Sequence, residues 1–172
     1  MHNNPCHAFT LLEFLVTLLI ISIMMTVGIP SFHTMITKHR LKGATETIYS
    51  DLQLARLEAI KRNKKISFSF KTGNAKNWCY AIHDGITCNC NIPDNCTLDD
   101  KSAIVISGHV FKGIDLDTNF RQGTTSFNPV RGAANGGSIT LSANEISSKV
   151  IVSTRGRIRI CSQDLMDYPG CL

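Results

Sequence analysis

Arginine recurs at alternate positions in the C-terminal segment Arg155-Gly156-Arg157-Ile158-Arg159. On a β-strand, side chains two residues apart point to the same face and lie about 6.6–6.8 Å apart. Phosphates along one DNA strand have a similar separation, so Arg157 and Arg159 can each bind one phosphate through the paired N–H donors of the guanidinium group. A continuous strand would add Arg155 to this row, whereas a turn with positive φ at Gly156 would present Arg155 from a loop. The same pattern also fits a solvated strand edge, where arginine discourages aggregation.

An apolar run near the N-terminus contains one acid. The run extends over 21 residues, from Phe9 to Ile29, which is enough to cross a bilayer as a helix. A carboxylate inside a bilayer costs about 2.5–3.5 kcal/mol at the centre and less near the ends. We therefore expect Glu13 to have a partner. The alternative is an ordinary signal anchor or a cleaved secretory peptide, although the leader 1–8 contains no Lys or Arg.

The chain has seven cysteines, of which only Cys6 precedes the apolar run. An even number in the rest of the chain favours disulfides in an oxidising compartment. We expect a Cys161–Cys171 bridge near the C-terminus, with the other four cysteines stapling the segment between residues 79 and 96. A zinc site is the alternative, but the Cys88-Asn89-Cys90 spacing is shorter than the usual two-residue spacer. We predict no metal and no cofactor. The six candidates are Cys79, Cys88, Cys90, Cys96, Cys161 and Cys171.

Residues suited to catalysis do not form a recognisable motif. The histidines lack a Ser, Cys or acidic partner at a motif spacing. The acids between residues 84 and 117 match no calcium-loop pattern, and we interpret them as a solvated acidic face. We therefore predict that the protein is not an enzyme.

The net charge of +5 is unevenly distributed along the sequence. Residues 38–76 carry +7 and residues 121–172 carry +3, whereas residues 77–120 carry −4. Two basic regions therefore flank an acidic one. This arrangement fits a polyanion as partner, and it also fits ordinary solvated faces.

Periodicity defines the elements that position these residues. Apolar residues recur every three or four positions from Leu41 to Ala59, as expected for an amphipathic helix, and we predict one helix from Phe9 to Arg62. The period changes to two at 66–70, and further strands are predicted at 78–83, 104–111, 138–143, 149–154 and 157–161. The predicted fold class is α+β, with one long N-terminal helix packed on an antiparallel β-sheet domain.

The N-terminal segment Phe9-Thr-Leu-Leu-Glu13, after a short polar leader, resembles the processing signal of type IV pilins and pseudopilins. The resemblance implies that a prepilin peptidase cuts between Ala8 and Phe9 and that the new N-terminus is methylated. It also implies that Glu13 pairs with the N-terminal amine of a neighbouring pilin subunit in the filament.

Two further stretches are similar to the GspH/FimT group of minor pilins and pseudopilins: the helix segment 48–63 and the segments from Ser126-Phe-Asn-Pro-Val-Arg-Gly132 onward. The implied organisation is a leader (1–8), a transmembrane and assembly helix (9–30), the amphipathic half of the same helix (31–64) and a β-rich periplasmic or extracellular domain (65–172). The implied location is the inner membrane, with a single pass, and then a cell-surface pilus.

FimT-type minor pilins of naturally transformable bacteria bind DNA through a Gly-Arg-x-Arg motif, which residues 156–159 match. The resemblance therefore implies non-specific DNA binding during natural transformation, through Arg157 and Arg159 with Arg155 and Gly156, and with Lys149 and Arg131 as secondary candidates. The alternative is a structural subunit that primes assembly of a pilus or a type II secretion pseudopilus without binding DNA.

Overall fold

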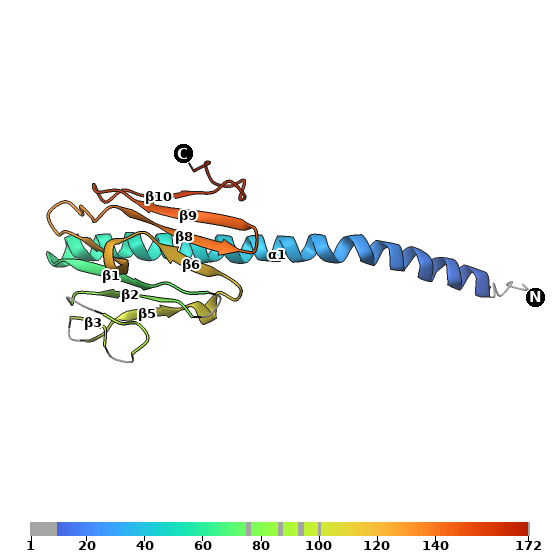
Figure 1. Cartoon of the computed structure of the whole chain (residues 1–172), viewed down its shortest axis with the longest axis horizontal. Coiled ribbons are helices and arrows are strands. Elements are labelled where there is room, and N and C mark those ends of the chain that lie inside the picture. Colours follow the sequence, from blue (N-terminus) through green and yellow to red (C-terminus); the bar gives the residue numbers. More distant parts are fainter. Residues whose placement is uncertain (1–9, 75–76, 86–87, 93–94, 100, 172) are drawn as a thin grey trace, which may run out of the picture. The chain divides into compact units, whose positions relative to one another are not determined.

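Figure 1 shows a computed structural model of the chain, which describes residues 10–74, 77–85, 88–92, 95–99 and 101–171, without the side chains of residues 27–31 and 101–102. The chain divides into two compact units, residues 1–36 and residues 37–172. The single long helix, α1 (Leu11–Arg62), contributes to both units.

The described residues of the second unit form ten strands and two short 3-10 turns. Most of the strands form two antiparallel four-stranded sheets, with the orders β5-β2-β1-β7 and β10-β9-β8-β6, and β3 and β4 form a small hairpin. The strands are β1 (Ile66–Lys71), β2 (Cys79–His83), β3 (Thr97–Leu98), β4 (Lys101–Ser102), β5 (Ile104–Ser107), β6 (Asp115–Thr118), β7 (Thr124–Phe127), β8 (Gly137–Ala143), β9 (Ile146–Val152) and β10 (Ile158–Cys161). The 3-10 turns are Gly108–Val110 and Arg121–Gly123.

The hydrophobic core lies between the C-terminal half of α1 and the two sheets (Figure 1). The predicted apolar stripe of the helix is fully buried: Leu41, Ala44, Ile48, Leu52, Ala55 and Ala59. Burying one leucine or isoleucine side chain of this stripe contributes about 1.5–3 kcal/mol. Two polar contacts also join the helix to the sheets. Thr45 Oγ1 lies 2.5 Å from Ser148 Oγ on β9, and the Tyr80 hydroxyl donates a 2.7 Å hydrogen bond to Asp51.

The predicted α+β class is confirmed, but several strand boundaries are corrected. The strand expected at 104–111 ends at Ser107, because Gly108 lies against the Trp78 indole and begins a 3-10 turn capped by the Ser107 side chain. The strand expected at 149–154 is β9, which starts at Ile146 and ends at Val152. The strand expected from Arg157 starts instead at Ile158, because residues 153–157 form a turn. Strands β3, β4, β6 and β7 were not predicted, and the β-rich domain has two main sheets instead of one.

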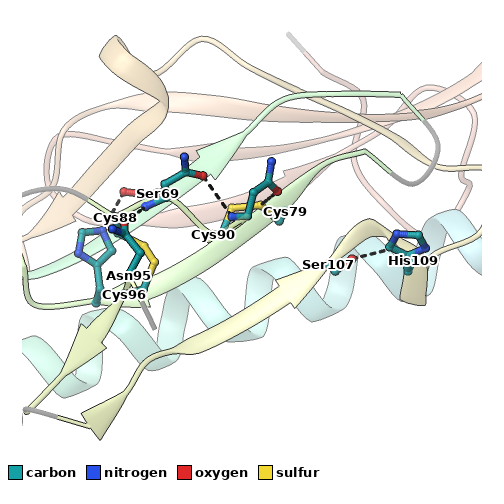
Figure 2. Close-up of a disulfide and its surroundings, with 11 residues drawn as sticks. Ser69, Cys79, Cys88, Cys90, Asn95, Cys96, Ser107 and His109 are labelled. Carbon is teal, nitrogen blue, oxygen red and sulfur yellow. Dashed lines mark hydrogen bonds between the residues drawn. A yellow bond between two sulfur atoms is a disulfide. The ribbon is translucent and has the colours of Figure 1, made fainter. Parts of the chain in front are cut away.

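Three disulfides hold the chain in the second unit. Cys161–Cys171 joins the end of β10 to the C-terminal segment, as predicted. The other four cysteines form Cys79–Cys90 and Cys88–Cys96, which staple the loop after β2. Figure 2 shows these four cysteines close together beside Asn95. The described residues contain no group of His, Cys, Asp or Glu side chains arranged to hold a metal ion.

Candidate nucleic-acid interface

A tight turn between β9 and β10 presents the arginine motif. The Ser153 amide donates a 2.9 Å hydrogen bond to the carbonyl of Arg157, and the Gly156 amide donates a 2.8 Å hydrogen bond to the carbonyl of Ser153. The Arg157 amide donates to the Ser153 side chain at 3.1 Å. Gly156 has φ of 76°, a conformation that strongly favours glycine. Of the two arrangements considered from the sequence, the structure therefore has the turn, and Arg155 projects from it.

Arg157 and Arg159 are both exposed and flank the buried Ile158. Arg159 lies on β10, whereas Arg157 is the last residue of the turn that precedes this strand. Arg159 pairs with Ile151 across the β9–β10 ladder. β10 is an edge strand, so among the described strands only β9 pairs with it.

Lys149 lies on the same face of the sheet as Arg159. It pairs with Cys161 on β10 and with Thr140 on β8, and it is half-buried. Residues in this diagonal relation on neighbouring strands are about 7–8 Å apart at the backbone. Lys149 therefore adds positive charge beside Arg159, further from the turn.

A second turn places Arg131 next to the first. Between β7 and β8, the Gly132 amide donates a 2.8 Å hydrogen bond to the carbonyl of Asn128, and Gly132 has φ of 62°. The Ala134 amide donates to the carbonyl of Thr154 at 3.1 Å, which ties this turn to the arginine turn. The exposed Arg131 is thus brought to the same end of the unit as Arg155, although 24 positions separate them in the sequence.

No acidic side chain that the structure describes neutralises these arginines. Arg131, Arg155, Arg157 and Arg159 form no ion pair with any residue that the structure describes. Two unit charges about 10 Å apart in water repel by only about 0.4 kcal/mol before screening, so the fold tolerates the cluster. We call these four residues the arginine cluster.

The basic segment of α1 is different, because acids neutralise part of it. Arg62 pairs with Glu58 and Asp99, and Lys64 lies 3.3 Å from Asp99. Lys42 lies 2.8 Å from Asp167, and this ion pair raises the pKa of Lys42 and lowers the pKa of Asp167. Two acids from outside residues 38–76, Asp99 and Asp167, therefore neutralise part of the +7 charge that was predicted to support polyanion binding.

The predicted processing site, Ala8 and Phe9, lies outside the described residues. Glu13 is exposed in the first turn of α1, where its amide hydrogen-bonds to the Thr10 side chain, and it forms no ion pair with a described residue. Large apolar side chains between Leu11 and Met25 are 47–79 % exposed. Within the part of the chain described by the structure, no helix has the length and apolarity needed to cross a membrane.

One polar pair in the core was missed by sequence analysis. The Nε2 atom of His83 lies 2.8 Å from Ser69 Oγ, which in turn lies 3.1 Å from Thr124 Oγ1. His83 is 1 % exposed, and burial lowers its pKa. The pair depends on the register of β1 against β2, which no motif spacing reveals. It lies inside the sheet, so we interpret it as part of the core.

A long N-terminal helix whose C-terminal half packs on antiparallel sheets defines a pilin-like fold. Solved structures agree with this class. The type IV minor pilin FimU of Pseudomonas aeruginosa aligns with a TM-score of 0.53 at 18 % identity, over 71 % of this chain and 88 % of FimU. The minor pseudopilin EpsH from the type II secretion system of Vibrio cholerae aligns with a TM-score of 0.50 at 14 % identity, over 78 % of this chain and 98 % of EpsH.

Sequence comparison identifies the family. The profile described as Type II transport protein GspH matches residues 44–156, and the prokaryotic N-terminal methylation motif matches residues 3–29. The chain therefore belongs to the GspH family of type IV minor pilins and pseudopilins. Membership implies processing by the prepilin peptidase, anchoring in the inner membrane and association with other pilin subunits. No curated protein sequence gives a significant match. The GspH match ends at Gly156, so Arg157 and Arg159 lie just beyond it.

Proposed function

We propose that this chain is a minor type IV pilin of the FimT type that binds DNA non-specifically during natural transformation. The observation that carries the proposal is the arginine cluster: four exposed arginines, three on two adjoining turns and Arg159 at the start of β10, none of which forms an ion pair with a residue that the structure describes. Arg157 and Arg159 are the primary contacts, with Arg155 on the turn, and Arg131 and Lys149 beside them.

The chemistry of the cluster favours contacts to the phosphate backbone. A guanidinium offers paired N–H donors that match two phosphate oxygens, and such charge-assisted bonds are stronger than neutral ones. Base stacking is not expected, because every aromatic side chain of the second unit is buried or half-buried in its core. The expected binding therefore depends steeply on salt and little on DNA sequence.

The N-terminal part of the chain fits this role. We propose that residues 9–30 store the subunit in the inner membrane with its domain in the periplasm, until Glu13 pairs with a neighbouring subunit and the chain enters a pilus. The exposed apolar residues of α1 between Leu11 and Met25 need a cover of lipid or of other helices. The three disulfides fit an oxidising compartment outside the cytoplasm.

The test measures DNA binding by the detergent-solubilised full chain, using fluorescence anisotropy with a labelled duplex of arbitrary sequence. Wild type is compared with the Arg157→Gln, Arg159→Gln variant and with a control of equal charge, Arg40→Gln, Arg121→Gln. Both control arginines are exposed but lie away from the arginine cluster. Arg121 lies before β7, whereas the Gly132 turn comes after that strand. Arg40 lies on α1, about 24 Å along the helix axis from Arg56.

The proposal predicts that the Arg157 and Arg159 variant loses most of its affinity while the control keeps it. Equal losses in both variants would indicate a general effect of net charge.

Absence of binding in the wild type would leave the second candidate, a structural subunit that primes assembly of a pilus or secretion pseudopilus. That candidate is favoured by the position of β10 at a sheet edge, where arginine prevents edge-to-edge pairing. It predicts that deleting the chain abolishes piliation or secretion while DNA binding is absent.

A further inference from the structure

The two turns of the arginine cluster meet through their glycines. A β-carbon added to Gly156 would lie 1.7 Å from the carbonyl oxygen of Gly132, so only glycine fits here. Both residues also have positive φ, at 76° and 62°. This contact places the Cα atoms of Arg131 and Arg155, the residues that precede the two glycines, within about 13 Å of each other.

The side chain of Arg56, from α1, lies beneath this contact. A β-carbon on Gly132 would be 2.7 Å from Arg56 Nε and 3.0 Å from its Cγ, and one on Gly156 would be 3.3 Å from Nε. Nε of Arg56 is buried and has no hydrogen-bond partner in the described structure. Arg56 also forms no ion pair with a described residue, so its charge adds to that of the arginine cluster.

We infer that the DNA-binding surface is one unit built from both turns, and that Gly132, Gly156 and Arg56 are the positioning residues that hold it together. The inference rests on the proposed function. It extends that function because it states that the arginines are held in place by the contact between the Gly132 turn and the Gly156 turn, which are far apart in the sequence. In this arrangement, one phosphate backbone engages Arg131 from the Gly132 turn, Arg155 and Arg157 from the Gly156 turn, and Arg159 from the start of β10. The Gly-Arg-x-Arg motif alone does not make the site.

Three substitutions in the full chain separate the parts of this inference. Gly156→Ala keeps every arginine but forces the two turns apart. Its matched control is Gly113→Ala, because Gly113 has φ of 77° and no atom within 4 Å of an added β-carbon. Gly113→Ala therefore shares the backbone strain of positive φ with Gly156→Ala, but it does not introduce a steric clash. Arg131→Gln removes the positive charge of the Gly132 turn. Arg56→Met is compared with Arg56→Lys, which retains the charge on a linear stem.

Each variant is titrated with the labelled duplex at several salt concentrations, and its fold is checked by circular dichroism. We expect Gly156→Ala to bind about tenfold or more weakly with a shallower salt dependence, and Gly113→Ala to bind as wild type. Arg131→Gln should weaken binding about tenfold and make the log–log salt slope less negative by about 0.9. Arg56→Met should weaken binding, and Arg56→Lys should restore most of it.

Wild-type affinity and salt slope in Arg131→Gln would overturn the inference, as would wild-type binding by a folded Gly156→Ala protein. If Gly156→Ala does not fold, Arg131→Gln and the pair of Arg56 variants decide the question. Loss of binding in Arg157→Gln, Arg159→Gln together with normal binding in Arg131→Gln would keep the proposed function and reject the two-turn surface. No binding in wild type would reject the proposed function itself.

Discussion

Acidification should destabilise the globular unit through His83. This side chain is 1 % exposed between β1 and β5, and its Nδ1 atom is buried. Its Nε2 atom lies 2.8 Å from Ser69 Oγ. Burial lowers the pKa of His83, so the folded protein keeps the ring neutral where the unfolded chain takes up a proton.

The sign and size of the effect follow from this difference in proton uptake. The unfolded chain has a histidine pKa of about 6.5, so the stability associated with neutral His83 is present above that pH. It is lost as the pH falls below about 6.5, by up to about 1.4 kcal/mol per pH unit. Between pH 8 and pH 5 the loss is at most about 2 kcal/mol. Asp51 contributes with the opposite sign at lower pH, because burial raises the pKa of its carboxyl group.

The assay is urea unfolding at pH 8, 7, 6 and 5 for wild type, His83→Gln and the control His109→Gln, whose histidine is exposed. The quantity measured is the free energy of unfolding as a function of pH. For each protein, the value at each pH is compared with the value of the same protein at pH 8, because His83→Gln also changes the absolute stability. Wild type and the control should lose stability in parallel, whereas His83→Gln should show a flatter profile. The same steepness in all three proteins would refute the reasoning.

The remaining predictions concern the two ends of the chain. Replacing Cys161 and Cys171 by serine should lower the free energy of unfolding by about 2.7 kcal/mol, given their separation of 10 residues; a loss below about 1 kcal/mol in urea unfolding would contradict this. Replacing Glu13 with alanine should reduce incorporation into filaments, because it removes the one acid of the apolar run, and normal amounts in sheared pili on immunoblots would disprove the pairing role. The chain trimmed to residues 37–172 should sediment as a monomer without detergent, because the exposed apolar residues of the N-terminal unit are gone; self-association would show that another surface drives assembly.

The elements that sequence analysis predicted well are those with a regular burial pattern. The stripe from Leu41 to Ala59 has helical spacing because one side of this part of α1 faces the core. The two long strands of the second sheet, β8 and β9, alternate between buried and less buried residues, and they were found with small boundary errors. In contrast, β6 reads Asp-Leu-Asp-Thr and β7 reads Thr-Thr-Ser-Phe, so neither has the apolar content that distinguishes a strand from a loop.

The candidate site was predicted only in part, for a comparable reason. The alternation of Arg157, Ile158 and Arg159 is a local pattern, and both arginines are exposed beside the buried Ile158, although only Arg159 lies within a strand. The approach of the Gly132 turn to the Gly156 turn depends on where β7 and β9 end in two different sheets. No local pattern contains that information. The sequence therefore suggested Arg131 as a candidate without indicating what brings it to the site.

The most direct measurement of the central claim is the salt dependence of DNA affinity in wild type and in the Arg157→Gln, Arg159→Gln variant. Each phosphate contact to duplex DNA contributes about −0.9 to the slope of log K against log salt concentration. We predict a slope of about −2 to −4 for the wild type, and a slope that is less negative by about 1.8 for the variant. Equal slopes in the two proteins would contradict the claim that these arginines bind phosphates.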